Sequence, residues 1–218
     1  MRRRAICRTP TGVLAALALL LIASSALPDG TTQAVRPSAS FPPGDLARGK
    51  LIAETCTTCH GDVEIMAGDP PIRPPRLFHQ RASATFFALQ AYRSGDRESE
   101  VMKPLAAALD DQQMRDIAAY LASEPLGPPV AQMASSQAHA FAISRCGLCH
   151  GETGMGEMEG VPILTGQDKD YLKRALVDYK EGRRADVTMR AVASEMSETE
   201  MNEVALYYSS QHALERIP

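Results

Sequence analysis

The clearest hydrophobic patterns in the chain are two amphipathic stretches, each with apolar residues at positions i, i+3, i+4 and i+7. The apolar positions are Met114, Ile117, Ala118 and Leu121 in the first stretch, and Met201, Val204, Ala205 and Tyr208 in the second. A capping-box pair precedes each stretch, Asp110 with Gln113 and Ser197 with Glu200. The pattern therefore predicts two α-helices, which begin after Asp110 and after Ser197.

Four more helices are expected from weaker patterns. Two middle helices fit residues 84–93 and 169–180, and each is followed by a glycine that can cap it, Gly95 or Gly182. Two leading helices fit residues 45–55 and 136–145 and run into cysteine-containing motifs. Neither half of the chain shows the apolar–polar alternation that would predict strands. The expected fold class is therefore all-α.

The elements follow in the same order in both halves because the sequence repeats itself. Cys56-Thr-Thr-Cys59-His60 recurs 90 residues later as Cys146-Gly-Leu-Cys149-His150. Beyond this motif the offset is 87 residues, and it aligns the pairs Pro75/Pro162, Gln80/Gln167, Tyr92/Tyr179, Arg97/Arg184 and Met102/Met189. We therefore expect two tandem small helical domains, one for each repeat.

Residues 1–26 are expected to be a cleaved signal peptide. Arg2, Arg3 and Arg4 precede an apolar run, residues 13–23, that is too short to span a bilayer, and Ser24-Ser25-Ala26 supplies small residues for cleavage. Residues 27–40 are then an N-terminal tail, 41–124 the first domain, 125–130 a proline-rich linker and 131–218 the second domain.

The charge of the mature chain argues against nucleic acid as a partner. The whole chain has a formal net charge of −3, and residues 1–26 contain four arginines and no acidic residue, so the charge falls to −7 after cleavage. A nucleic-acid-binding surface needs clustered Lys and Arg. The partners are expected to be proteins with basic docking patches.

The two Cys-x-x-Cys-His motifs predict two covalently bound haem c groups. Cys56, Cys59, Cys146 and Cys149 would bond the porphyrin vinyl groups, and His60 and His150 would be proximal iron ligands. A zinc site is disfavoured because the two cysteine pairs lie too far apart in the sequence. A thioredoxin-like site lacks its βαβ context, and simple disulfides do not explain a histidine after both pairs.

The second axial ligands are expected to be Met102 and Met189. They occupy equivalent positions shortly before the last helix of each half, in segments expected to be loops. Met196 is the nearest rival, but its repeat partner is Leu109, which cannot bind iron. Met114 and Met201 lie on apolar helix faces and are expected in the core.

Three further pairs of positions leave alternatives open. His79 replaces Gly166 of the other repeat, and it is either a surface residue or an alternative ligand to the first iron. The carbonyl groups of Pro75 and Pro162 either accept a hydrogen bond from the proximal histidines or merely form turns. Arg97 and Arg184 are candidates for pairing with haem propionates, but we expect solvated surface arginines.

With these motifs, the chain resembles the dihaem cytochromes c of the c4 type over about residues 45–211. The second half carries the resemblance best, through residues 146–150, Pro162-Ile-Leu-Thr-Gly-Gln167, Tyr171-Leu172, Tyr179-x-x-Gly182-Arg-Arg184 and Tyr207-Tyr-Ser-Ser-Gln211. The resemblance implies two class I cytochrome c-like domains, axial ligation by His60, Met102, His150 and Met189, and an internal pseudo-twofold. The first half departs at Leu77-Phe-His79-Gln80, which lacks the family's glycine before Gln80.

The expected function is electron transfer in the periplasm without catalysis, since two six-coordinate irons leave no open position for a substrate. A quinol-oxidising complex or a dehydrogenase is the expected donor, and a terminal oxidase or reductase the acceptor; peripheral membrane contact stays open. The chain is also similar to the dihaem subunits of periplasmic flavin dehydrogenases, which makes a dedicated dehydrogenase subunit the alternative. A dihaem peroxidase is disfavoured because it needs an exchangeable iron site.

Overall fold

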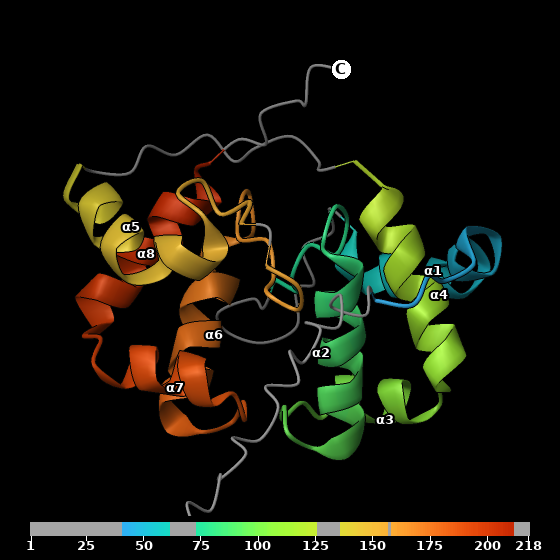
Figure 1. Ribbon diagram of the computed structural model, residues 1–218. Helices are drawn as coiled ribbons and strands as arrows, with labels where there is room; N and C mark the ends of the chain where they lie inside the picture. Colours follow the sequence, from blue (N-terminus) through green and yellow to red (C-terminus); the bar gives the residue numbers. More distant parts are fainter. Residues whose placement is uncertain (1–40, 62–72, 126–135, 157, 212–218) are drawn as a thin grey trace, which may run out of the picture. The chain divides into compact units, whose positions relative to one another are not determined.

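The computed structural model describes residues 41–61, 73–125, 136–156 and 158–211, which form two sets of four helices (Figure 1). The first half contains α1 (Leu46–His60), α2 (Ala82–Ser94), α3 (Met102–Ala107) and α4 (Asp111–Ser123). The second half contains α5 (Ser136–His150), α6 (Lys169–Glu181), α7 (Val187–Ser194) and α8 (Glu198–Ser209). Within the described residues the only β-type pairing is an isolated bridge, so the all-α fold class is confirmed.

The local signals at the helix ends are confirmed. Both capping boxes are formed, at Asp110 before α4 and at Ser197 before α8. Gly95 and Gly182 end α2 and α6 with φ angles of 93° and 82°, in the left-handed region that glycine adopts without strain. These ends depend on residues within one helical turn of one another, which explains why the sequence predicts them.

Two expectations about the helices are corrected by the structure. The leading helices do not stop before the cysteine motifs but continue through them to His60 and His150. The segments that carry Met102 and Met189 are not loops but short helices, α3 and α7. Helices of six and eight residues are too short for the sequence pattern to predict them, and packing against their neighbours stabilises them more than propensity does.

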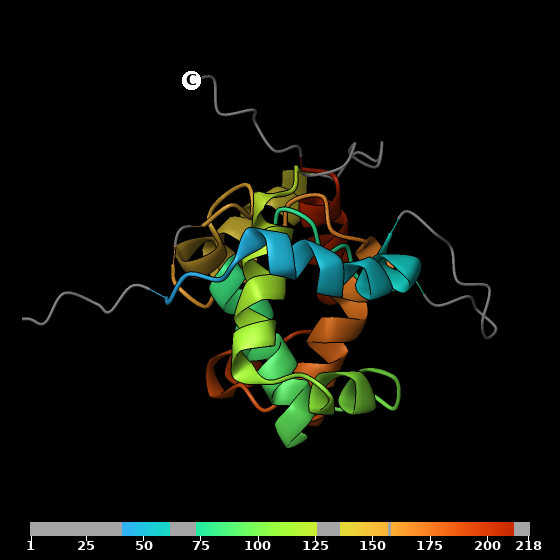
Figure 2. The same cartoon turned by 90° about the vertical axis from the view of Figure 1, so that its right-hand side faces the viewer.

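Helices α1 and α4 cross in close contact, as Figure 2 shows. Gly49 and Ala53 are buried on the contacting face of α1. A Cβ atom built on Gly49 would lie only 2.0 Å from the backbone oxygen of Asp116 in α4. The absence of a side chain at Gly49 therefore sets the distance between the two helices.

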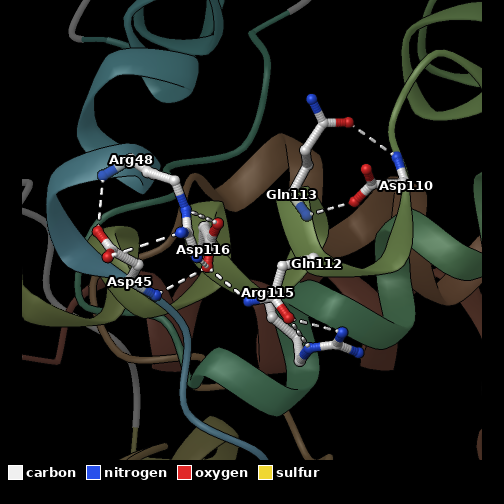
Figure 3. A network of polar contacts seen from close by, with 7 residues as sticks. All are labelled: Asp45, Arg48, Asp110, Gln112, Gln113, Arg115 and Asp116. Carbon is white, nitrogen blue, oxygen red and sulfur yellow. Dashed lines mark hydrogen bonds and ion pairs between the residues drawn. The ribbon is translucent and has the colours of Figure 1, made fainter.

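A polar network ties the start of α1 to the middle of α4 (Figure 3). Asp116 is 1 % exposed, and its carboxylate accepts hydrogen bonds from the Asp45 backbone N–H (2.7 Å) and from Arg48 Nε (2.9 Å). Gln112 Nε2 donates a further bond to it at 2.9 Å. The hydrogen bond from Arg48 is the main cause that lowers the pKa of Asp116 to about 2, against the opposing effect of burial.

This network predicts a pH-dependent stability. An aspartate that titrates near pH 3.9 when unfolded and near 2 when folded contributes about 2 kcal/mol above pH 4, and this contribution is lost as the pH falls towards 2. We expect Asp116→Asn to lower the unfolding free energy by about this amount at pH 7 and to approach the wild type in acid. Denaturant unfolding at both pH values measures the difference. Asp111→Asn is the control: it removes an exposed ion pair with Arg93, and we expect it to change the unfolding free energy little.

The second half has a core of its own, built on α5, α6 and α8. Ala138 and Ala142 of α5 are buried against Tyr208, which is fully buried. The Tyr208 hydroxyl donates to the carbonyl oxygen of Gly151 at 3.2 Å, just beyond the cysteine motif. His139, for which no functional role was predicted, stacks on the ring of Tyr207 with centroids 5.2 Å apart.

The two halves are joined by a pair of equivalent glutamine side chains. Gln80 accepts from the N–H of Ile163 at 2.7 Å and donates to its carbonyl oxygen at 3.0 Å. Gln167 accepts from the N–H of Arg76 at 2.8 Å and donates to its carbonyl oxygen at 2.9 Å. Since Arg76 and Ile163 are themselves repeat partners, the contact obeys an internal twofold, in agreement with the pseudo-twofold that the resemblance implies.

A second symmetric contact follows α2 and α6. Arg97 and Arg184 form the isolated antiparallel bridge. On either side of it, the N–H of Glu98 donates to Arg183 O at 2.9 Å and the N–H of Ala185 donates to Asp96 O at 2.7 Å. Backbone bonds of this kind carry no sequence signal, so the repeat alone did not predict them.

Several predicted segments lie outside the described residues: the signal peptide, the N-terminal tail, most of the linker and the start of the second domain at 131–135. The division into the domains 41–124 and 131–218 therefore stays a prediction. No helix in the described part of the chain is both long and apolar enough to cross a membrane.

Candidate haem-binding sites

The cysteines of each motif lie on the last turns of a helix. Cys56 and Cys59 belong to α1, and Cys146 and Cys149 belong to α5; no disulfide joins any of the four. Residues three apart on a helix share a face, so each pair can reach one side of a single porphyrin. Burial raises the pKa of the Cys56 thiol and that of the Cys146 thiol, the latter to about 11.

Each motif histidine is held by a proline carbonyl of the following loop. His60 Nδ1 lies 2.8 Å from Pro75 O, and His150 Nδ1 lies 3.0 Å from Pro162 O. A carbonyl oxygen only accepts, so Nδ1 must carry the proton and Nε2 keeps a free lone pair. The hydrogen bond suggested by the repeated prolines is thus confirmed, and it fixes the tautomer that an iron ligand needs.

The electrostatic surroundings of the two histidines differ. Burial is the main cause that lowers the pKa of both, and the bonds to the proline carbonyls oppose it. The nearby charge is Arg97 for His60, which lowers its pKa further, and Asp186 for His150, which raises it. Both rings are neutral at neutral pH, the state in which Nε2 can donate to a metal.

Met102 and Met189 lie in equivalent short helices and are partly buried. Met102 is the first residue of α3, whereas Met189 is the third residue of α7. Met189 packs against the core cluster of the second half. Met196 is 2 % exposed in that cluster, which agrees with a core role for the rival methionine.

His79 adopts a backbone conformation that ordinary residues avoid. Its φ is 61°, and the equivalent Gly166 has φ 64°. In both halves the N–H of this residue donates to the last helix, from His79 to Leu121 O at 2.9 Å and from Gly166 to Tyr208 O at 3.0 Å. The fold therefore demands a left-handed residue here, and only the second half supplies glycine.

This strain predicts a stabilising substitution. We expect His79→Gly to raise the unfolding free energy by up to about 1 kcal/mol, because glycine occupies the left-handed region without steric cost. The ferric absorption spectrum should stay unchanged, because Met102 is the expected second ligand of the first iron. Gly166→Ala is the reverse control: it places a side chain at the equivalent left-handed position and should lower the unfolding free energy. A change of spin state in His79→Gly would instead assign this histidine to the first iron.

The expectation that Arg97 and Arg184 are solvated surface residues is wrong. Arg184 is 8 % exposed, and Arg97 is partly buried with its guanidinium carbon 4.3 Å from the centre of the Tyr92 ring. The Tyr171 hydroxyl accepts a hydrogen bond from Arg97 across the two halves at 2.8 Å. Although burial opposes it, the two guanidinium groups lower the pKa of Tyr171 to about 8.

The Nε–H groups of both arginines fit an anionic partner. Each is buried without a hydrogen-bond acceptor, and Arg184 Nε has only an ion pair with Asp178 at 3.5 Å. A buried donor left without an acceptor costs free energy. Haem propionates are carboxylates that would supply the missing acceptors.

Together, the residues present in each half fit one covalently attached haem. They supply two thiols on one helix face, a neutral imidazole with Nε2 free, a methionine before the last helix and open cationic donors. The fold and the sites therefore define the class of protein as a helical c-type cytochrome with a haem site in each half.

Comparison with known proteins agrees with this class. The family model for cytochrome c matches residues 46–124. The thiosulfate dehydrogenase electron acceptor of Stutzerimonas stutzeri (strain A1501) is 34% identical over 175 residues, which is 72% of this chain and 79% of that protein. Cytochrome c4 of Pseudomonas aeruginosa is 33% identical over 183 residues, or 78% and 90% of the two chains. The crystal structure of reduced recombinant cytochrome c4 from Pseudomonas stutzeri superimposes with a TM-score of 0.63 at 26% identity, covering 78% of this chain and all of that one.

The chain belongs to the cytochrome c family and, within it, to the dihaem cytochromes of the c4 type. It carries two covalently bound haem c groups and is an electron-transfer cytochrome.

Sequence reasoning missed the role of the glutamines that join the halves. Gln80 and Gln167 were recognised as repeat partners, but nothing near them predicted what they bind. The available signal was their duplication as polar residues beside the proline-containing loops. Tyr171 belongs to the pattern that carries the resemblance, but it is not duplicated, because its repeat partner is Ala84, and nothing predicted its hydrogen bond with Arg97.

Proposed function

We propose that this protein is a periplasmic electron carrier whose two haem irons are each ligated by one histidine and one methionine. Cys56 and Cys59 attach the first haem, and Cys146 and Cys149 attach the second. His60 with Met102 and His150 with Met189 are the axial ligands. The observation that carries the proposal is the duplication of the histidine–carbonyl contact, with a methionine 27 residues beyond the accepting proline in both halves.

Haem c supplies a one-electron Fe(III)/Fe(II) couple. The protein's residues hold that couple in place: the proline carbonyls keep each imidazole oriented, and the thioethers prevent haem loss. Met102 and Met189 would bind the irons and so close the positions that a substrate would need. The chain then transfers electrons without catalysing a reaction of its own.

Export across the inner membrane follows from the predicted signal peptide, and the acidic mature chain suits basic docking partners. The physiological role is transfer between a quinol-oxidising complex or a dehydrogenase and a terminal oxidase or reductase. Mass spectrometry of the exported protein should show a chain that begins after Ala26 and carries two haems.

The electron-carrier proposal is tested with purified holoprotein. Haem should stay with the polypeptide in acid acetone, both ferric irons should be low-spin, and hydrogen peroxide should not be turned over. The cytochrome reduced by a membrane fraction should be reoxidised by an oxidase. A high-spin ferric iron together with peroxide turnover would favour a peroxidase and contradict the proposal.

A second candidate is the dedicated electron acceptor of one dehydrogenase. It is favoured by the likeness to a protein named as the electron acceptor of thiosulfate dehydrogenase. In that case thiosulfate and a thiosulfate dehydrogenase should reduce the protein much faster than a quinol-oxidising complex does. The dehydrogenase should also be recovered with the protein from its native source.

A further inference from the structure

A glutamine of the first half reaches the loop that orients the motif histidine of the second half. Gln80 Oε1 accepts a hydrogen bond from the N–H of Ile163 at 2.7 Å. This N–H belongs to the same peptide group as the carbonyl oxygen of Pro162, which lies 3.0 Å from His150 Nδ1. Because the C=O and N–H of a planar trans peptide point in opposite directions, one continuous chain of hydrogen bonds runs from His150 through this peptide group to Gln80.

The equivalent chain connects the second half to the histidine of the first half. Gln167 Oε1 accepts a hydrogen bond from the N–H of Arg76 at 2.8 Å. The carbonyl oxygen of the same peptide group, that of Pro75, lies 2.8 Å from His60 Nδ1. Every member of this chain is the repeat partner of the corresponding member of the first chain. Each half therefore supplies the last acceptor in the hydrogen-bond chain of the other half's histidine.

Both glutamine side chains are also fixed by their own half. Gln80 Oε1 accepts a second hydrogen bond from the N–H of Arg81 at 3.1 Å, and Gln167 Oε1 accepts one from the N–H of Asp168 at 2.9 Å. These two residues directly precede α2 and α6. Gln167 is 6 % exposed and Gln80 is partly buried, so water competes little for these bonds. The acceptor oxygens are therefore held at rigid helix starts.

We propose that Gln80 and Gln167 are positioning residues that each strengthen the hydrogen bond of the motif histidine in the opposite half. Hydrogen bonds in a chain polarise one another, so an acceptor at the peptide N–H makes the proline carbonyl a better acceptor for Nδ1–H. A stronger bond at Nδ1 raises the basicity of Nε2, which stabilises the ferric iron and lowers the reduction potential. This inference deepens the proposed function and rests on the proposed ligation by His60 and His150.

The test is potentiometry of the holoprotein, in which Met102→Ala and Met189→Ala assign the two redox waves to their halves. Gln80→Met has a side chain of similar length without an amide. It should move the wave assigned by Met189→Ala, that of the opposite half, to higher potential and leave the other wave in place. Gln167→Met should raise only the wave assigned by Met102→Ala. In the diamagnetic ferrous protein, the Nδ1–H proton resonance of His150 should move upfield in Gln80→Met, because its hydrogen bond is weaker.

Ser83→Ala is the matched control. It removes the acceptor of another hydrogen bond between the halves, which the N–H of Gly160 donates at 3.0 Å from the same loop but from a different peptide group. Both waves should stay in place. Gln80→Glu keeps an oxygen acceptor for the N–H of Ile163 and should not raise the wave of the second half.

Three results overturn the proposal: an unchanged second-half wave in Gln80→Met, movement of the first-half wave instead, or equal movement of both waves. A shift in Ser83→Ala as large as that in Gln80→Met also overturns it. If Gln80→Met does not assemble with haem, Gln167→Met gives the same test in the opposite direction. Failure of the ligation itself is seen separately, because the ring protons of a His150 that is not bound to haem iron lack the large upfield shift caused by the porphyrin ring current.

Discussion

Met189→Ala is expected to convert one ferric iron of the protein from low-spin to high-spin. Alanine offers no donor atom, so the iron keeps only His150 on its axis or takes up water, which is a weaker ligand than a thioether. Because methionine ligation raises haem potentials, the potential of that haem should fall by on the order of 0.1 V, within the roughly 0.8 V range that axial ligands span. Electron paramagnetic resonance and potentiometric titration measure the two effects.

Met102→Ala should have the same effect on the other haem, which assigns each redox wave to its half. Met196→Leu is the control, since Met196 is a buried methionine and its repeat partner is Leu109. An exchange of similar volume costs less than about 1.5 kcal/mol and should leave both irons low-spin. A low-spin Met189→Ala protein, or a high-spin Met196→Leu protein, would falsify the assignment.

Gly49→Ala should be the most damaging single-methyl substitution in the first half. Its Cβ would lie 2.0 Å from the backbone oxygen of Asp116 and 2.9 Å from Cβ of Tyr120, so α1 and α4 must separate. Overpacking of this kind costs about 1–3 kcal/mol, and here backbone atoms cannot give way as a side chain would. The loss should exceed the gain of about 1 kcal/mol that alanine brings in helix propensity. Denaturant unfolding followed by circular dichroism measures the net loss.

Gly147→Ala in α5 is the matched control. Its Cβ would meet only the side chain of Ile143, at ordinary contact distances of 3.6 Å from Cγ2 and 3.9 Å from Cβ, and the equivalent position of the first half already holds Thr57. We expect this variant to be as stable as the wild type or slightly more stable. Equal stability of both variants would show that α1 and α4 adjust more easily than their backbone contact implies.

The sequence by itself determined the features that depend on neighbouring residues. Asp110 with Gln113 marked the start of α4, and Gly182 marked the end of α6, because caps form within one helical turn. The spacing of Cys56, Cys59 and His60 predicted haem attachment, because both thiols and the histidine must face one porphyrin from a single helix. The repeat extended these predictions to the second half and selected Met102 and Met189 from the other methionines as the expected ligands.

Only the tertiary structure decided how the two halves meet. Gln80 binds the backbone of Ile163, which is 83 residues away in the sequence. No local pattern predicts a contact between a side chain and a backbone group at such a separation. The burial of Arg184 and the hydrogen bond from Arg97 to Tyr171 arise from the same packing. The strained φ of His79 is also set by a distant partner, the carbonyl group of Leu121. The physical reason is common to all three: helix propensity and capping act over about one turn, whereas the environment of a residue is fixed by whatever chain folds against it.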